Sequence, residues 1–121
     1  MSANFSTPLM GASILVAEDE SLIAMDFVDA LRDAGASIVG PAASLADAYR
    51  LASASIDLAC LDVDLRGEKI FPFADMLRER GIPFVFASGY DQHDMPARFR
   101  QTPYLTKPLN LEHLVEVLNT L

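Results

Sequence analysis

Short apolar runs recur along the chain, and polar side chains close four of them. The runs cover residues 14–17, 58–61, 84–87 and 104–106, and they are followed by Glu18-Asp19, Asp62, Ser88 and Lys107. A strand that is buried on both faces of a parallel sheet reads as such a run. Because the carboxyl ends of parallel strands lie along one edge, the pattern predicts that these polar side chains converge there.

Strand-like and helix-like segments alternate along the rest of the chain. Ser44 and Asn110 stand where helix N-caps are expected, and Gly35 and Gly81 stand just past expected helix ends. Alternation of this kind predicts parallel strands joined by right-handed crossovers. Strands are expected at residues 13–17, 37–40, 57–61, 83–87 and 103–106, and helices at 21–34, 44–54, 72–80 and 110–121.

One segment breaks the alternation. Residues 91–101 have little apolar periodicity, and Pro96 interrupts them, so we expect at most a short helix that begins near Pro96 after a loop. The expected fold class is α/β, with a doubly wound five-stranded parallel sheet of order 2-1-3-4-5. This is the flavodoxin-like arrangement, with a short or disordered helix between its last two strands.

Composition narrows the class of protein. The 121 residues suit one domain, and 51% apolar residues argue against long disorder. Residues 1–12 are small and polar and are expected to form a flexible tail, which leaves 13–121 as the domain. The net charge of -8 argues against nucleic acid, because binding phosphates needs a basic face. The single cysteine, Cys60, and the lack of a signal pattern or a membrane-spanning run lead us to expect a cytoplasmic protein.

The predicted edge has a specific chemistry. In the 2-1-3-4-5 order, the first and third strands are neighbours, which brings Glu18, Asp19 and Asp62 together. Carboxylates that lie so close to one another cannot all stay ionised without a counter-charge. Mg²⁺ can supply that charge, because it prefers oxygen ligands. Lys107 supplies only one positive charge. An ionised carboxylate also attacks phosphorus, and Asp62, between Asp19 and Ser88, is the best placed to do so.

Taken in order, these segments resemble the receiver domain of two-component response regulators over about residues 12–121. Residues 15–20, Leu-Val-Ala-Glu-Asp-Glu, are similar to the acidic-pair segment of that family. Residues 61–65, Leu-Asp-Val-Asp-Leu, followed by Gly67, are similar to the phosphoacceptor segment. Thr106-Lys-Pro108 is similar to the segment whose Lys-Pro peptide bond is often cis in the family.

The resemblance implies a role for each residue. Asp62 would be the phosphoacceptor of an aspartyl-phosphate phosphoprotein, and Ser88, where the family has Thr or Ser, would contact the phosphate together with Lys107. A histidine kinase or phosphotransfer protein would supply the phosphoryl group. The Mg²⁺ ligands implied are Glu18, Asp19, Asp62 and the backbone carbonyl of Asp64.

The resemblance also implies how a signal leaves the site. Tyr104 stands at the aromatic switch position, three residues before Lys107, and Gly89 is expected to give the end of the fourth strand unusual freedom. Phe86-Ala-Ser-Gly-Tyr90 is similar to the Phe-Ala-Thr-Gly-X-Tyr signature of the "FAT GUY" receivers, with Ser for Thr and Tyr one place earlier. That subgroup is associated with bacterial general stress signalling. We expect a monomer that switches protein–protein contacts, with ordering of residues 89–101 as the signal.

Several alternatives stay open from the sequence. Asp62-Val-Asp64 also matches the Asp-x-Asp core of haloacid-dehalogenase-type phosphatases, in which Asp64 would be a general acid; we expect no enzyme beyond its own phosphorylation and dephosphorylation. A receiver that only docks, and is never phosphorylated, is a third reading. Asp19 has an alternative role as a helix cap, Tyr104 as ordinary core, and Tyr90 as a cover for the sheet edge. The sequence does not choose between phosphate relay, phosphate sink and allosteric binder, or between a single-domain protein and a fragment.

Overall fold

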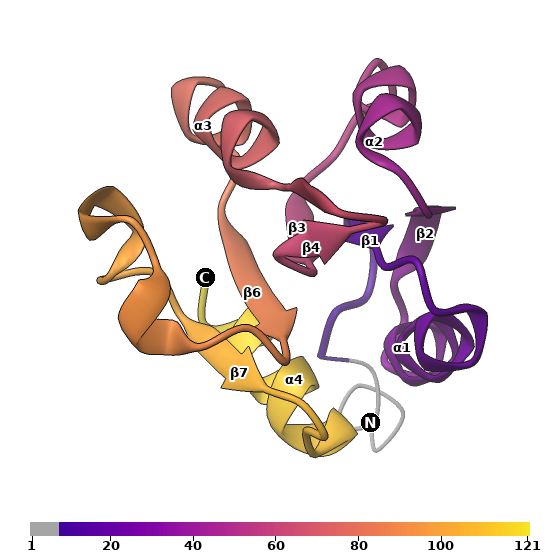
Figure 1. Cartoon of the computed structure of the whole chain (residues 1–121). Coiled ribbons are helices and arrows are strands. Elements are labelled where there is room, and N and C mark those ends of the chain that lie inside the picture. Colours follow the sequence, from indigo (N-terminus) through magenta and orange to yellow (C-terminus); the bar gives the residue numbers. More distant parts are fainter. Residues whose placement is uncertain (1–7) are drawn as a thin grey trace.

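The computed structural model describes residues 8–121 and shows a five-stranded parallel sheet with helices on both faces (Figure 1). The strands lie in the order β2-β1-β3-β6-β7, and every neighbouring pair is parallel. This order confirms the predicted 2-1-3-4-5 arrangement. The strands are β1 (Ser13–Ala17), β2 (Ser37–Ala42), β3 (Leu58–Leu61), β6 (Phe84–Ser88) and β7 (Tyr104–Thr106).

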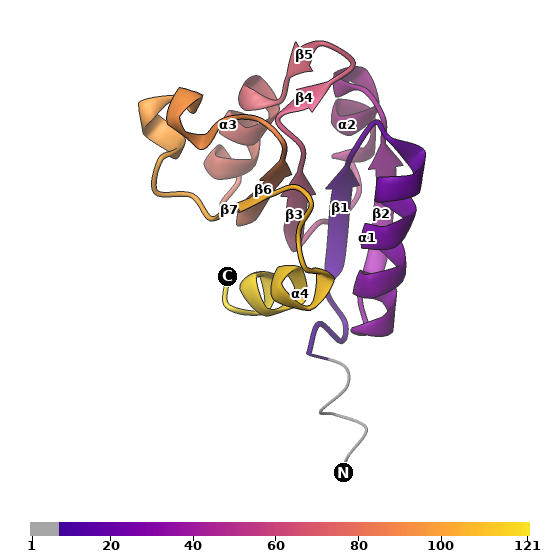
Figure 2. The ribbon, with the colours of Figure 1, turned by 60° about the horizontal axis from the view of Figure 1, so that its bottom comes forward.

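Four helices cover the sheet, with α1 and α4 on one face and α2 and α3 on the other (Figures 1 and 2). Both expected caps are confirmed, since Ser44 Oγ accepts the Asp47 N–H and Asn110 Oδ1 accepts the His113 N–H, each at 3.1 Å. None of the helices in residues 8–121 is long and apolar enough to cross a membrane. The helices are α1 (Ser21–Asp33), α2 (Leu45–Leu51), α3 (Phe71–Glu79) and α4 (Leu111–Asn119).

The two faces of the sheet bury different side chains. Consecutive strand residues point to opposite faces, so Val85 packs under α1 and α4 while Phe84 and Phe86 pack under α2 and α3. The α1/α4 face is mainly aliphatic, with Phe27 as its buried ring. The α2/α3 face holds most of the aromatic side chains, which are Phe71, Phe73, Phe84, Phe86, Tyr90, Phe99 and Tyr104.

The connection between β6 and β7 contains two short 3₁₀ turns instead of a long helix. These are η2 (Gln92–Asp94) and η3 (Ala97–Phe99), and Pro96 directly precedes the second turn. The expectation of at most a short helix near Pro96 is therefore confirmed. Figure 1 shows these turns, in orange, beyond the β7 edge of the sheet.

Side chains from α3 hold this connection in place. The ring of Phe99 is 1% exposed, and the guanidinium carbons of Arg78 and Arg98 lie 4.7 and 4.8 Å from its centroid. Arg98 also forms a two-pronged ion pair with Asp75, at 2.8 and 3.0 Å, and Arg78 donates to the Arg98 carbonyl at 2.7 Å. The segment thus has its own anchor without having a regular helix.

A small antiparallel hairpin follows β3, and the sequence did not predict it. It consists of β4 (Asp64–Leu65) and β5 (Glu68–Lys69), with Arg66 at φ 53° and Gly67 at φ 88° in the turn. Figure 2 shows the hairpin at the carboxyl ends of the strands, above β3. Strands of two residues carry no readable alternation, and Arg-Gly is a weaker signal for this kind of turn than Asn-Gly.

The packed structure begins earlier than expected. Leu9 is only 4% exposed in the aliphatic core, and its N–H donates to the Ala34 carbonyl at 2.9 Å. The expected tail covered residues 1–12, but its last part belongs to the folded body. The remaining part of that expectation, residues 1–7, lies outside the described residues.

Candidate functional site

The carboxyl ends of four strands bring the predicted polar residues together. In residues 8–121 the buried polar side chains are Glu18, Asp62 and Ser88, at 1%, 7% and 2% exposure. Lys107 lies beside them with its side chain 15% exposed, and the Lys107–Pro108 peptide bond is cis. Buried polar groups are costly unless they find partners, so their concentration at one edge indicates a site and not a packing accident.

These residues border an open hollow, which we call the edge crevice. Its walls come from the ends of β1, β3, β6 and β7 and from the β4–β5 hairpin. The residues that line it are Asp19, Glu20, Asp62, Asp64, Ser88, Gly89, Tyr90 and Lys107. Tyr90 therefore borders the crevice, which answers the alternative left open by the sequence.

The Asp62 carboxylate is held from two sides. Ser88 Oγ donates to its Oδ1 at 2.6 Å, and Lys107 Nζ donates to its Oδ2 at 2.9 Å. The N–H of Asp64 lies 3.4 Å from Oδ1. A carboxylate with a hydroxyl and an ammonium as neighbours is fixed in position at the mouth of the central strand.

Glu18 is the most constrained acid of the group. Burial raises its pKa to about 7; Lys107 and the Glu20 N–H oppose that shift, and the Asp62 charge adds to it. Lys107 Nζ forms an ion pair with Oε1 at 2.5 Å and another with Asp62 Oδ2 at 2.9 Å, so one ammonium is shared between two acids. A buried carboxylate that shares its cation with a second acid is suited to a metal ion as a further counter-charge.

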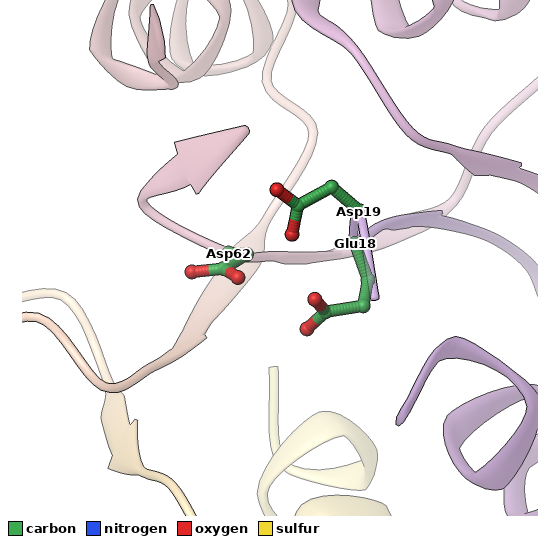
Figure 3. Close-up of side chains that lie close together, drawn as sticks. All are labelled: Glu18, Asp19 and Asp62. Atoms are coloured by element: carbon green, nitrogen blue, oxygen red, sulfur yellow. The ribbon is translucent and has the colours of Figure 1, made fainter. Parts of the chain in front are cut away.

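The acids also have the spacing of a metal site. Figure 3 shows Glu18, Asp19 and Asp62 gathered around one space, and each offers an oxygen within 4.8 Å of the others. Oxygens on opposite sides of an octahedral Mg²⁺ lie about 4 Å apart, since each Mg–O bond is about 2.1 Å long. Lys107 balances only one of three negative charges, so the donor set fits a hard divalent cation.

Asp19 does not cap α1. The N-cap residue of that helix is Glu20, and no side chain caps the helix there. Asp19 Oδ2 instead accepts the backbone N–H of Arg66 at 2.9 Å, which ties the acidic pair of β1 to the turn of the hairpin. The capping alternative for Asp19 is therefore wrong.

Asp64 turns its carboxylate into the hairpin. It accepts the Gly67 N–H at 2.7 Å and pairs with Lys69 Nζ at 2.8 Å, and the hydrogen bond from Lys69 lowers its pKa. Its charge is therefore already partnered, and it stays ionised at neutral pH. This arrangement does not favour Asp64 as the general acid of a phosphatase.

The two predicted switch positions differ. The Tyr104 hydroxyl donates to the Tyr90 carbonyl, and the Tyr90 N–H donates to Ser88 Oγ at 3.1 Å. Tyr104 is thus connected to Asp62 through a chain of hydrogen bonds. Gly89 has no positive φ, and a Cβ there would meet nothing within 4 Å, so this conformation does not itself require glycine.

Sequence reasoning missed two contributors to the crevice, the hairpin and Lys69. Lys69 contacts Asp64 and also lies over the ring of Tyr90, 5.2 Å from its centroid. The only local sequence signal for the hairpin was Gly67 between a basic and an acidic residue. This combination is too common to predict a turn by itself.

Comparison with known proteins decides the family. A family model described as the response regulator receiver domain matches residues 14–119. The chain belongs to this family. Receiver domains are the phosphoacceptor modules of two-component signalling and take the phosphoryl group from histidine kinases or phosphotransfer proteins.

Individual relatives of this receiver domain support the family assignment. The transcriptional regulatory protein PdtaR of Mycobacterium tuberculosis is 34% identical over 110 residues, which cover 87% of this chain and 54% of PdtaR. The chain therefore spans about half the length of the curated relative that it matches. SdrG from Sphingomonas melonis Fr1 is 39% identical in its solution structure, with a TM-score of 0.78 and coverage of 91% of this chain and 97% of SdrG.

A third likeness concerns the fold alone. The response regulator PhyR from Brucella abortus is 24% identical, with a TM-score of 0.79, and the match covers 98% of this chain and 50% of PhyR. The receiver fold is thus shared with larger proteins in which it forms only one part.

Proposed function

We propose that Asp62 is the phosphoacceptor of this receiver domain. The observation that carries the proposal is the double contact of its carboxylate with Ser88 Oγ at 2.6 Å and Lys107 Nζ at 2.9 Å. One carboxylate oxygen attacks phosphorus, the bond from phosphorus to the donor's histidine nitrogen breaks, and an acyl phosphate forms. Ser88 and Lys107 then turn from the carboxylate to the phosphoryl oxygens.

In this proposal Glu18, Asp19, Asp62 and the backbone carbonyl of Asp64 hold Mg²⁺. The metal, when bound, neutralises charge on the transferring phosphoryl group. The chain's own residues do the rest, because Lys107 supplies a fixed positive charge and burial keeps Glu18 in place. Binding of the cation also relieves the repulsion among the three carboxylates.

The signal would leave through the 89–101 segment. Ser88 moves toward the phosphoryl group, and this movement disturbs the hydrogen bonds from Ser88 to Tyr90 and from Tyr90 to Tyr104. Gly89 provides the backbone freedom that such a movement needs. Amide exchange across residues 89–101, measured with and without beryllofluoride, checks this step, and unchanged exchange would refute it.

The phosphodonor would approach over α1. Leu22 and Met25 are exposed there at 80% and 58%, beside the groove between α1 and the loop before α4. A histidine kinase or phosphotransfer protein that reaches Asp62 would cover them. Leu22→Ser should leave labelling by acetyl phosphate unchanged and weaken transfer from any phosphorylated kinase that labels the native chain; equal transfer would contradict this docking surface.

The cellular role we propose is general stress signalling in the bacterial cytoplasm, through contacts with a downstream protein. The signature at residues 86–90 and the likeness to SdrG support it. Deletion of the gene should lower survival under salt, heat or oxidative stress. Survival equal to that of the parent strain under all three would contradict the assignment.

The central experiment is labelling by acetyl phosphate with and without Mg²⁺. The native chain should gain one phosphoryl group in a Mg²⁺-dependent reaction, and Asp62→Asn should gain none. Asp64→Asn is the matched control, because it removes a neighbouring carboxylate but keeps the backbone carbonyl, and it should still be labelled. Label retained in Asp62→Asn would overturn the proposal.

Hydrolysis of unrelated phosphate esters by the same variants tests the phosphatase alternative. A phosphatase that used Asp64 as a general acid would hydrolyse unrelated phosphate esters continuously, and Asp64→Asn would lose that turnover. The pairing of Asp64 with Lys69 leads us to expect neither result.

A further inference from the structure

Lys69 connects two walls of the edge crevice that come from different parts of the chain. Its Nζ lies 2.8 Å from Asp64 Oδ2, on the hairpin, and 5.2 Å from the centroid of Tyr90, in the loop after β6. Both Asp64 and Tyr90 line the crevice that holds Asp62. The three side chains therefore form a bridge across the crevice, which we call the Lys69 bridge.

Two residue pairs make a hairpin that is marginal without further contacts. Its base is held by the core, because Leu65 and Ile70 are fully buried and the Ile70 N–H donates to the Val63 carbonyl at 2.8 Å. At the rim of the crevice, the Arg66 N–H ties the hairpin to Asp19. The contact between Lys69 and Tyr90 adds a second link at this rim, to the loop after β6.

Lys69 also changes what Asp64 offers to the crevice. Its ammonium donates to Asp64 Oδ2 at 2.8 Å, and this oxygen would otherwise be free to orient a water molecule in the crevice.

We propose that Lys69 is a positioning residue that keeps the crevice narrow and so prolongs the life of the phosphoryl group on Asp62. The inference rests on the proposed role of Asp62. In the reaction that it slows, a water oxygen bonds to phosphorus and the bond between phosphorus and the Asp62 oxygen breaks. Inorganic phosphate leaves, the carboxylate is restored, and a proton passes to solvent.

The test is the half-life of the phosphoryl label after excess [³²P]acetyl phosphate is removed, with Mg²⁺ present. Lys69→Gln should shorten the half-life about two- to fivefold, the change that loss of one exposed cation–π contact causes in an opening equilibrium. Lys69→Arg keeps the charge and the stacking and should restore the native half-life. Tyr90→Leu should shorten the half-life as Lys69→Gln does, and the double variant should shorten it no further.

Glu68→Gln is the control for the hairpin itself. It neutralises a charge one residue earlier on the same strand, where the side chain points to the other face, and should leave the half-life unchanged. A native half-life in Lys69→Gln, or additive effects in the double variant, would overturn the proposal. Absence of label in the native chain would instead refute the role of Asp62, so the two failures are distinguishable.

Discussion

The two faces of the sheet differ in the feature that opposes their stability. On the α1/α4 face, regular helices of 13 and 9 residues pack over aliphatic side chains, and the strain lies in charge, because Glu18 is buried beside Asp62. On the α2/α3 face the packing is aromatic, and the irregular element is the connection between β6 and β7. A cation would relieve the first problem, whereas only side-chain contacts restrain the second.

This difference bears on the proposed function, in which one site both accepts a phosphoryl group and passes on a signal. The regular face gives the acids a rigid frame, which metal binding needs. The aromatic face holds residues 89–103 by a few contacts of Phe99, Arg78 and Arg98, and elements that move are drawn from such weakly held regions. Under the proposed function, metal binding and readout would therefore lie on opposite faces of the strands that connect them.

Truncation of one buried side chain on each face should distinguish the two faces most clearly. Leu114→Ala, in α4 and fully buried, should lower the free energy of unfolding by about 2–5 kcal/mol and speed amide exchange throughout the domain. Phe99→Ala, equally buried, should speed exchange mainly in residues 89–103 while β1 and β3 keep most of their protection. Urea unfolding and amide exchange check both, and uniform exchange in Phe99→Ala would remove the distinction.

Neutralising Glu18 should stabilise the metal-free protein. We expect Glu18→Gln to raise the free energy of unfolding by about 1–3 kcal/mol at pH 8 in EDTA, since one pKa unit corresponds to about 1.4 kcal/mol. The folded-state pKa of about 7 lies above the ordinary 4.5. Below about pH 4.5 Glu18 is therefore protonated in both the folded and the unfolded state, and its burial does not lower the stability through its charge. The gain from Gln therefore grows as the pH rises from about 4.5 to about 7 and levels off above it.

Thermal unfolding with EDTA and with Mg²⁺ provides the measurement. Mg²⁺ should stabilise the native chain more than Glu18→Gln. A variant that is less stable than the native chain in EDTA at pH 8 would show that the charge of Glu18 supports the fold instead of opposing it.

The smallest effect is expected for the ion pair that restrains the β6–β7 connection. Asp75 and Arg98 are 39% and 50% exposed, so Asp75→Asn should cost only about 0.2–1 kcal/mol, and less at high salt. Exchange in residues 97–103 should rise slightly at low salt, and Asp47→Asn, which removes the exposed pair with Arg50 on α2, is the control. A loss above 2 kcal/mol would mean that the segment belongs to the global folding unit.

The sheet and the convergence of its polar residues could be predicted because buried parallel strands leave short apolar runs. Once the strand order follows from the alternation of strands and helices, Asp62 must lie between Glu18 and Ser88. The helix ends were also readable, since Ser44 and Asn110 act through the N–H groups of their own first turns. Such features depend on neighbours in sequence or on a topological rule.

The features that escaped prediction depend on contacts between loops. The Asp64 carboxylate pairs with Lys69, and in the turn of the hairpin Arg66 adopts a positive φ and donates its N–H to Asp19. The contact of Arg78 with Phe99 and the ion pair of Asp75 with Arg98 join α3 to a segment about twenty residues away in sequence. No local pattern signals pairs of this kind.

The buried position of Leu9 matters for anyone who trims this chain to its family match. The family match begins at residue 14, and a fragment trimmed to that boundary would discard Leu9 and uncover the apolar surface next to Ala34. A fusion partner or purification tag should therefore be joined upstream of Pro8. Poor solubility of a shorter fragment would then report the missing leucine and not an unstable receiver.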